Sequence, residues 1–303
     1  MNQYDLIIVG AGPAGITAGV YAARKGINFL IVTDDVGGQT LWSADVENYT
    51  GYQFITGAEL VGKFEQHLKQ FNVALKTDSP VQRILQGEQN LFSVQTKDAV
   101  FTAKSVMVAS GRRPHLLSVL GEDLYRNKGL TYCATCDGPL FAQKTVAVVG
   151  GGNSALDAVL QLVNIAQKIY LININSQLGG DEIMRKKVEG SSKVEIFNNA
   201  QVREVAGSAF VEKIIFSQGQ DTKELAVSGV FVEIGSVPNS EIIDFVEKNS
   251  KMEIKVDSLN RTSVSGVFAA GDVTDVPEKQ IIVAAGEGAK AVLGVSRYLL
   301  KME

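Results

Sequence analysis

Tyr4 to Val32 reads YDLIIVGAGPAGITAGVYAARKGINFLIV, Lys144 to Ile172 reads KTVAVVGGGNSALDAVLQLVNIAQKIYLI, and the two stretches align without a gap. Each contains a short apolar run, a glycine-rich turn, a segment with helical periodicity and a second apolar run. That order is typical of the β-strand–helix–β-strand unit that binds dinucleotides. The sequence therefore predicts an α/β protein with two such units.

The glycines of the first copy each have a physical role in this kind of turn. Gly10 makes the tight turn after the apolar run, Gly12 lets backbone approach a pyrophosphate, and Gly15 lets the helix pack close to the strand. Since the N–H groups at a helix N-terminus bind phosphates, we place a dinucleotide on Gly10, Gly12, Pro13, Ala14 and Gly15. An ordinary glycine-rich turn is the alternative for one match, but two matches in the same context disfavour it.

A second motif, far along the chain, identifies the nucleotide at the first copy. Residues 262–272 read TSVSGVFAAGD, a turn and a short apolar strand followed by Gly271 and Asp272. This segment resembles the second flavin fingerprint of flavoproteins with two dinucleotide-binding domains, in which the Asp accepts a hydrogen bond from a ribityl hydroxyl of FAD. An acidic turn residue is the alternative, and the first fingerprint makes it the weaker one.

Composition limits the class of protein and its partners. A length of 303 residues suggests about two domains, and 45% hydrophobic with 20% charged residues is ordinary for a globular protein. The net charge of −4 gives no reason to expect nucleic acid or an anionic membrane as partner. The apolar runs are too short to span a bilayer, and the N-terminus lacks the basic region of a signal peptide. We expect a cytoplasmic protein.

The chain has two cysteines, Cys133 and Cys136, at the spacing of a redox-active dithiol. Zinc is the rival explanation, but a zinc site needs about four ligands and only His67 and His115 are available. We therefore expect no metal. Asp137 is the titratable neighbour of the thiols and the candidate proton carrier, with a helix or turn cap as its alternative role.

The order of the motifs predicts how the domains are arranged. The flavin fingerprint at Asp272 lies beyond the second dinucleotide-binding unit, so that unit interrupts the first domain. Proline-containing crossings are expected at 111–114 and 235–239, and together they would make a hinge. We predict an FAD domain of residues 1–114 and 241–303 and an inserted domain of residues 115–240. Further expected elements are strands at Phe92–Thr96 and Val230–Ile234 and a helix at Gly286–Leu299.

Taken together, the motifs resemble the low-molecular-weight thioredoxin reductases and their relatives, the flavoprotein subunits of alkyl hydroperoxide reductase. The likeness covers nearly the whole chain. It rests on GAGPAG at 10–15, GGQ at 37–39, ENYTG at 47–51, CATCDG at 133–138, GGGNSA at 150–155 and GVFAAGD at 266–272. The segment KQIIVAAGEGAK at 279–290 is more similar to the hydroperoxide reductase branch. That branch carries an N-terminal thioredoxin-like domain that has no counterpart here, so a separate thiol protein is the expected partner.

The resemblance implies a two-dinucleotide-binding-domain flavoprotein with a Rossmann-like insertion, and it assigns roles. Cys136 is the sulfur nearest the flavin, and Asp137 is the acid/base. The reduced pair then swings out as the inserted domain rotates, and it reduces a thioredoxin-like or glutaredoxin-like protein. A homodimer is expected. The further residues assigned to FAD are Gly37, Gly38, Gln39, Asn48, Lys279, Gln280 and Ile281.

One departure from the family bears on the electron donor. NADPH-dependent members follow the second strand of the inserted domain with His-Arg-Arg-x-x-x-Arg, whose arginines bind the 2′-phosphate, whereas residues 173–179 here read NINSQLG. NADPH is therefore disfavoured, because no residue there replaces the guanidinium–phosphate contacts. NADH and reduced ferredoxin both stay open, with a slight preference for NADH. The second nucleotide site, if used, is assigned to Gly150, Gly152, Asn153, Ser154 and Asn173.

The sequence thus predicts an FAD-dependent disulfide reductase in which electrons pass through flavin and the Cys133/Cys136 dithiol. A flavin-dependent oxidase or a flavin redox sensor on the same fold is the alternative from another class. A non-catalytic nucleotide-binding regulator is disfavoured, because it gives the dithiol no task.

Overall fold

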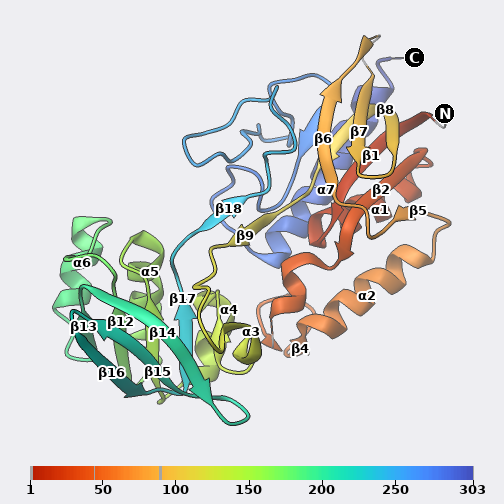
Figure 1. Ribbon diagram of the computed structural model, residues 1–303. Helices are drawn as coiled ribbons and strands as arrows, with labels where there is room; N and C mark the ends of the chain where they lie inside the picture. Colours follow the sequence, from red (N-terminus) through yellow and green to blue (C-terminus); the bar gives the residue numbers. More distant parts are fainter. Residues whose placement is uncertain (1–2, 44, 89–90, 303) are drawn as a thin grey trace.

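The computed structural model describes residues 3–43, 45–88 and 91–302, and it contains two α/β bodies joined by a pair of short strands. Figure 1 shows the larger body, formed by the two ends of the chain, and the smaller body, formed by its middle. Within the described residues, no helix combines the length and apolarity needed to cross a bilayer.

The larger body is built on a seven-stranded sheet in the order β5-β2-β1-β8-β7-β6, with β19 pairing with β8 on a separate branch. Strands β5, β2, β1, β8 and β19 pair in parallel, whereas β7 and β6 are antiparallel. The strands span Gln3–Ala11 (β1), Phe29–Val36 (β2), Ala74–Lys76 (β5), Val81–Gln86 (β6), Phe92–Thr96 (β7), Val100–Val108 (β8) and Val267–Ala269 (β19).

Alternate residues of β1 enter the two cores on either side of this sheet, as expected for a strand buried on both faces. Leu6 and Ile8 pack in the core that includes α1 (Pro13–Arg24) and α7 (Ile281–Leu299). Ile7 and Val9 pack in the opposite core, which includes the β6–β7 hairpin and the segment 242–256. The remaining elements of this body are η1 (Gly38–Trp42), β3 (Asp45–Val46), β4 (Ile55–Thr56) and α2 (Gly57–Lys69).

Two glycines allow the helices to approach the backbone closely. A Cβ on Gly15 would lie 1.9 Å from the carbonyl oxygen of Gly10, and a Cβ on Gly288 would lie 2.1 Å from that of Ala14. Neither distance is compatible with a side chain. The helices α1 and α7 therefore pack at a separation that only glycine permits at these positions.

The smaller body is built on a parallel sheet in the order β10-β17-β11-β12-β13. Its helices α5 and α6 pack on one face, and the antiparallel sheet β14-β15-β16 packs on the other. The strands span Leu130–Thr131 (β10), Thr145–Val149 (β11), Lys168–Ile172 (β12), Val194–Phe197 (β13), Ala200–Gly207 (β14), Val211–Gln218 (β15), Asp221–Ala226 (β16) and Gly229–Val232 (β17). The helices span Glu122–Tyr125 (α3), Ala134–Asp137 (α4), Gly138–Phe141 (η3), Asn153–Leu162 (α5) and Glu182–Glu189 (α6).

The two crossings between the bodies pair with each other. Strand β9 (Arg112–Pro114) is antiparallel to β18 (Ser236–Pro238), and they lie side by side between the bodies in Figure 1. The hydroxyl of Ser110 donates to the carbonyl of Asn239 at 2.7 Å, and the amide of Asn239 donates to the carbonyl of Ser110 at 2.8 Å. The two predicted crossings are thus adjacent. We propose that they divide the chain into an FAD domain of residues 1–114 and 241–303 and an inserted domain of residues 115–240.

Two element boundaries differ from the sequence prediction. Helix α7 begins at Ile281 rather than Gly286, because its glycines lie within the helix, where Gly288 faces the backbone of α1. Strand β17 ends at Val232 rather than Ile234, and the next residue, Glu233, already faces the interior space between the bodies. The strand predicted at Phe92–Thr96 is β7.

The two glycines of α7 give a matched test of helix packing. Gly286→Ala should raise the free energy of unfolding by about 0.4–1 kcal/mol, since a Cβ there meets nothing within 4 Å and alanine restricts the unfolded chain. Gly288→Ala should lower it by about 1–3 kcal/mol, because the same methyl group would contact the backbone of Ala14. Urea denaturation of both variants measures the difference. Equal effects would contradict this packing.

Candidate functional site

A cavity of about 1220 Å³ lies where the carboxyl ends of strands from both bodies approach one another. Its wall includes the turn after β1, the end of β2, the start of α7 and the Cys133–Cys136 turn of the smaller body. The structure therefore brings together most of the residues predicted for FAD and for the dithiol. Those that line it are Gly10, Gly12, Pro13, Ala14, Gly38, Gln39, Asn48, Gly271, Asp272, Lys279, Gln280, Ile281, Cys133, Cys136 and Asp137.

Gly15 and Gly37 are the two predicted FAD residues that shape the cavity without lining it. Gly15 holds α1 against β1, and Gly37, at φ +106°, donates its N–H to the carbonyl of Ala11 at 2.8 Å. Gly12 behaves differently, since a Cβ there would meet nothing within 4 Å. Within the described residues, no packing contact therefore requires glycine at position 12. Close approach of a ligand would require it.

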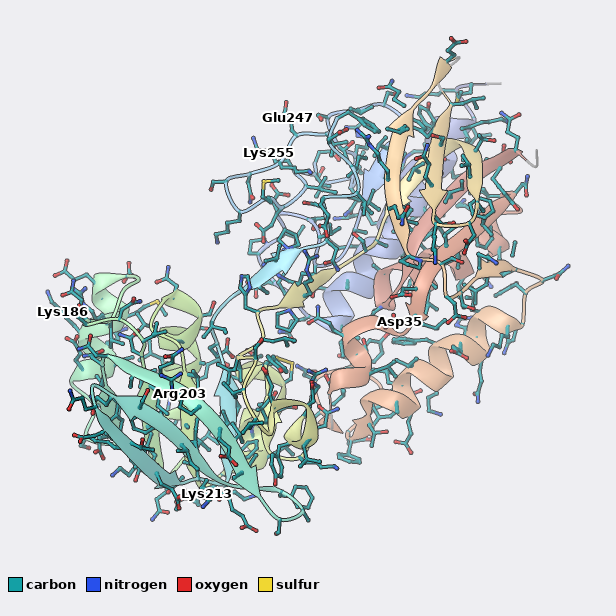
Figure 2. All side chains as sticks on the ribbon, viewed as in Figure 1. Asp35, Lys186, Arg203, Lys213, Glu247 and Lys255 are labelled. Carbon is teal, nitrogen blue, oxygen red and sulfur yellow. A yellow bond between two sulfur atoms is a disulfide. The ribbon has the colours of Figure 1, made fainter. Side chains whose placement is uncertain are left out.

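Charged groups lie at several places on the cavity wall, and the first is the end of β2. Asp34 and Asp35 follow the buried part of β2, about 20 residues beyond the glycine turn, where dinucleotide-binding units place an acid for the ribose. Figure 2 shows Asp35 at this end of the larger body. This pair was not predicted from the sequence, although its spacing from the glycine turn was a sufficient signal.

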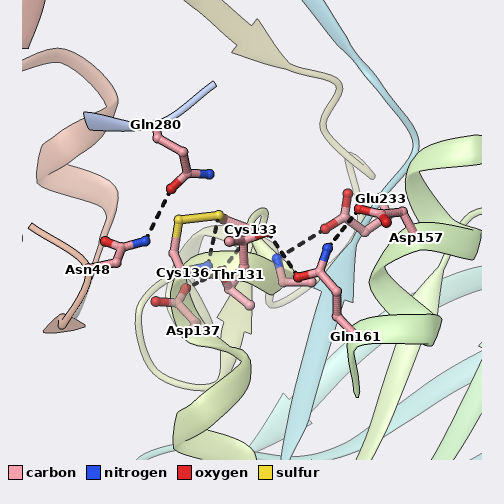
Figure 3. Close-up of a disulfide and its surroundings, with 11 residues drawn as sticks. Asn48, Thr131, Cys133, Cys136, Asp137, Asp157, Gln161, Glu233 and Gln280 are labelled. Carbon is pink, nitrogen blue, oxygen red and sulfur yellow. Dashed lines mark hydrogen bonds between the residues drawn. A yellow bond between two sulfur atoms is a disulfide. The ribbon is translucent and has the colours of Figure 1, made fainter. Parts of the chain in front are cut away.

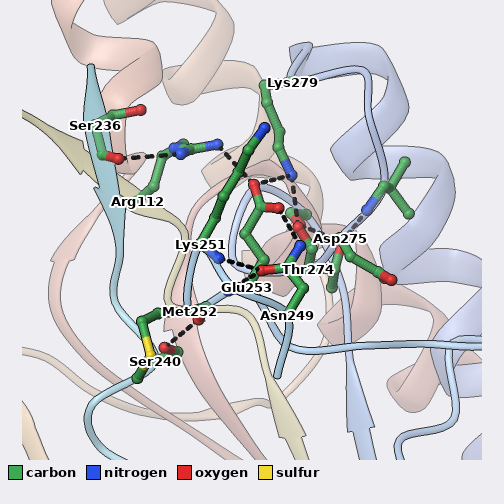
Figure 4. A network of polar contacts seen from close by, with 12 residues as sticks. Arg112, Ser236, Ser240, Asn249, Lys251, Met252, Glu253, Thr274, Asp275 and Lys279 are labelled. Atoms are coloured by element: carbon green, nitrogen blue, oxygen red, sulfur yellow. Dashed lines mark hydrogen bonds and ion pairs between the residues drawn. The ribbon is translucent and has the colours of Figure 1, made fainter. Parts of the chain in front are cut away.

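The second charged group is a network around Glu253, shown in Figure 4. The carboxylate pairs with Arg112 at 3.3 Å and with Lys279 at 3.4 Å, and Arg112 also donates to the carbonyl of Ser236 in β18 at 3.2 Å. Burial raises the pKa of the nearby Asp272, and the positive charges of Lys279 and Arg112 oppose that rise. The network thus connects the crossing strands to the wall beside Asp272.

Cys133 and Cys136 form a disulfide at the first turn of α4. Figure 3 shows the Cys136 side of the disulfide turned toward Asn48 and Gln280 of the larger body, whose side chains are hydrogen-bonded at 3.1 Å. The backbone N–H of Cys136 donates to the sulfur of Cys133 at 3.1 Å. Both sulfur atoms are thus held by a short helix that faces the predicted flavin site.

Asp137 is buried directly behind the disulfide and is connected to it through Thr131. The Thr131 hydroxyl donates to the Asp137 carboxylate and accepts the backbone N–H of Cys133 at 3.2 Å. A carboxylate held this way, within one helical turn of both cysteines, is suited to exchange protons with the dithiol.

A second acid at the dithiol, Glu233, was missed by sequence analysis. It follows β17, and its carboxylate accepts the backbone N–H of Ala134 at 3.3 Å. Burial, followed by the nearby charge of Asp157, raises its pKa to about 8, although the hydrogen bond from Ala134 opposes the shift. The signal in the sequence was the single acid that ends the apolar run GVFVEI.

A second cavity, of about 1100 Å³, lies at the glycine turn after β11 and is lined by all the residues predicted for a second nucleotide. Gly152 matches Gly12, since a Cβ there would also meet nothing within 4 Å. Asn173 is buried, and its amide donates to the carbonyls of Asn175 and Gln177 and to the side chain of Asn198. Its donors are therefore used within the protein rather than directed at a ribose.

Comparison with known proteins identifies the family. The model of the pyridine nucleotide-disulphide oxidoreductase family matches residues 4–288. The chain belongs to this family. The match confirms the interpretation of the fold as a two-dinucleotide-binding-domain flavoprotein and of the enzyme class as a flavoprotein disulfide oxidoreductase.

Among curated proteins, the chain is similar to an alkyl hydroperoxide reductase subunit of Escherichia coli (strain K12), with 39% identity over 309 residues. It is also similar to a protein called NADH dehydrogenase from Bacillus subtilis (strain 168), with 37% identity over 304 residues. Each alignment covers 99% of this chain and 59% of the relative. The chain thus spans about three fifths of the length of these relatives.

Among solved structures, a thioredoxin reductase from Streptococcus pyogenes MGAS5005 superposes with a TM-score of 0.94, 35% identity and 99% coverage of both chains. A Lactococcus lactis thioredoxin reductase described as being in the FR conformation gives a TM-score of 0.67 at 30% identity, with 98% of this chain and 99% of that one covered. A ferredoxin-flavin thioredoxin reductase from Clostridium acetobutylicum gives 0.54 at 29% identity and 99% coverage of both. These neighbours confirm the predicted resemblance.

Gly12 and Gly152 provide a matched test of the two nucleotide sites in this family member. Gly12→Val should weaken FAD binding at least tenfold, about 1.4 kcal/mol or more, because the side chain would occupy space that neighbouring residues leave open. Gly152→Val should leave flavin content unchanged. Flavin absorbance after gel filtration measures both. Full flavin content in Gly12→Val would contradict the assignment of this cavity to FAD.

Proposed function

We propose that the protein is an FAD-dependent disulfide reductase that passes electrons through flavin and the Cys133/Cys136 dithiol to a thioredoxin-like protein. The observation that carries this proposal is the position of the disulfide in the same cavity as both flavin fingerprints. In a structural protein or a simple nucleotide carrier, a dithiol at that place would have no role.

The residues that line the cavity support FAD as its ligand. The open position at Gly12 and the N-terminus of α1 suit the pyrophosphate, and the acids at the end of β2 suit the adenosine ribose. Asp272 suits the ribityl chain, and the Asn48–Gln280 pair lies beside the disulfide, where the redox-active ring belongs. FAD, when bound, would supply a two-electron carrier in reach of Cys136.

The dithiol turn supplies the remaining chemistry. Reduction breaks the S–S bond and leaves two sulfur atoms, at least one of which takes up a proton. Asp137 would deliver or remove this proton. One thiolate then attacks the disulfide of the partner protein, and the second resolves the mixed disulfide. Asp137 is suited to this role because Thr131 fixes its carboxylate relative to the backbone of Cys133.

The transfer to a protein substrate requires the smaller body to move, because the disulfide faces the cavity rather than the surface. The β9–β18 pair is suited to be the hinge, since it is the short connection between two separately packed cores. The TM-scores of 0.94 and 0.67 for two thioredoxin reductases of similar identity and full coverage support two arrangements of such bodies.

For the donor, we favour NADH over reduced ferredoxin. The open glycine cradle at Gly152 and the relative called NADH dehydrogenase support NADH, whereas the neighbour called ferredoxin-flavin thioredoxin reductase supports ferredoxin. NADPH is disfavoured, because Ile174, Asn175 and Gly179 replace the arginines of the family motif. Among the described residues, the cationic side chains that line the second cavity are Arg203 and Lys251. Arg203 already donates a hydrogen bond to Ser217.

Substitution of the dithiol tests the route. Cys133→Ser and Cys136→Ser should each abolish reduction of a thioredoxin-like protein while FAD stays bound, because both attack and resolution need a thiol. Asp137→Asn should slow turnover about 10²–10⁴-fold through loss of proton transfer. The exposed acid Asp157, replaced by Asn, is the matched control and should keep near wild-type turnover. Wild-type turnover in either serine variant would exclude the dithiol route and favour a flavin oxidase.

The donor is tested by anaerobic reduction of the flavin with NADH, NADPH and reduced ferredoxin in parallel. NADPH should bind about a hundredfold or more weakly than in an arginine-containing relative, since each charge-assisted contact contributes about 1.5–3 kcal/mol. Rapid flavin reduction by micromolar NADPH that is lost in Arg203→Ala would overturn this prediction and assign the phosphate to Arg203. Reduction by ferredoxin alone would decide against NADH.

A further inference from the structure

Glu233 connects the dithiol turn to the glycine turn of the second cavity. Its backbone N–H donates to the carbonyl of Val149 at 2.8 Å, and a Cβ on Gly150 would lie 2.3 Å from its carbonyl oxygen. Its carboxylate accepts the N–H of Ala134, the residue next to Cys133. Glu233 lines both cavities.

The charges around this carboxyl are mostly negative. Asp137 lies on α4, on the side of the disulfide. Asp157 lies on α5, beside Glu233. Gln161 connects the Asp157 carboxylate to the hydroxyl of Thr135. His115 packs beside the loop after Glu233, and the one ammonium that lines both cavities among the described residues is that of Lys251. A thiolate at Cys133 or Cys136 would thus form among carboxyl groups, which disfavours it when they are ionised.

We propose that Glu233 is a positioning residue that sets the proton balance of the dithiol: it fixes the amide of Ala134 and takes up a proton when a thiolate forms beside it. This inference rests on the proposed function only in taking the Cys133–Cys136 pair to be redox-active. It adds that a second acid, besides Asp137, governs how easily the pair is reduced.

Reduction of the pair conserves electrons and protons. Two electrons break the S–S bond, one sulfur takes a proton and becomes a thiol, and the other is left as a thiolate. The electrons come from the flavin in turnover, or from dithiothreitol in a test. Both the proton on the thiol sulfur and the proton that Glu233 takes up come from the bulk solvent. The carboxyl and the thiolate then share one proton between them as a coupled pair.

The sign of the pH dependence follows from the two forms of Glu233. Because its pKa is raised to about 8, the carboxyl is neutral at lower pH and does not oppose thiolate formation. Above that pH the carboxylate repels a thiolate, so reduction of the disulfide becomes less favourable than it would be beside a neutral group. Removing the charge of Glu233 should therefore leave the equilibrium constant for reduction of the disulfide unchanged at low pH, and should increase it progressively as pH rises.

The test compares wild type with Glu233→Gln, which keeps an oxygen to accept the N–H of Ala134 but carries no charge. The FAD-loaded protein is equilibrated with mixtures of reduced and oxidised dithiothreitol at about pH 6.5, 8.0 and 9.5, which bracket the raised pKa. Trapping of free thiols and mass spectrometry then give the reduced fraction of Cys133 and Cys136. The ratio of reduction equilibrium constants, Glu233→Gln over wild type, should be near one at about pH 6.5 and rise toward about tenfold at about pH 9.5, as expected for about one pKa unit of coupling.

Two further variants separate charge from structure. Asp157→Asn removes an exposed acid whose carboxylate is hydrogen-bonded to Gln161 and acts on Glu233 only through its charge. Its ratio should stay within about twofold of one at every pH, because exposed charges are screened. Glu233→Ala removes the hydrogen-bond acceptor as well as the charge. At the lowest pH the wild-type carboxyl is neutral, so a change in the reduction equilibrium of this variant there measures only the loss of the hydrogen bond to Ala134. A ratio for Glu233→Gln that does not change with pH would overturn the inference.

Failure of the proposed function would look different. If the wild-type disulfide resists reduction, or if the reduced protein does not turn over with a thioredoxin-like protein, the reductase assignment fails whatever Glu233 does. If the wild-type disulfide is reduced normally and only the pH-dependent ratio is missing, the role of Glu233 alone is excluded.

Discussion

The site depends on two parallel sheets that present their carboxyl ends to one cavity. Parallel strands carry their ligand-binding turns at that edge, so the turns after β1, β2 and β8 on one side meet the residues after β10 and β17 on the other. The antiparallel pair β9–β18 keeps the two edges opposed, and the Arg112–Glu253 ion pair ties that pair to the larger body. A disulfide in the smaller body thereby faces a nucleotide site in the larger one.

The same arrangement separates the two nucleotide turns. The turn at Gly12 opens into the cavity that contains the disulfide, whereas the turn at Gly152 opens mainly into its neighbour. Only a few residues, Glu233 among them, line both. Under the proposed function, exchange of electrons with a nucleotide and with a protein substrate would require the two bodies to change their relative position. A short two-stranded hinge would permit this at small cost in packing.

Much of this was predictable, because the glycine turns encode constraints that act over a few residues. The sequence predicted both dinucleotide-binding units, the order of the fingerprints and the adjacent crossings, since each has a local pattern. It missed the early start of α7, because glycines such as Gly286 and Gly288 disfavour a helix, and the contact of Gly288 with Ala14 is visible only in the fold. It also missed the hydrogen bond between Glu233 and Ala134 and the one between Asn173 and Asn198, which join residues distant in sequence. The contacts of such side chains can be seen only once the fold is known.

The central claim is that flavin and disulfide form one electron-transfer unit, and counting electrons tests it most directly. Anaerobic titration of the FAD-loaded protein with dithionite should take about four electrons per chain to bleach the flavin fully, two for the disulfide and two for the flavin. The Cys136→Ser variant should need about two. Full bleaching of the wild-type flavin after about two electrons, with the disulfide still intact, would contradict the account.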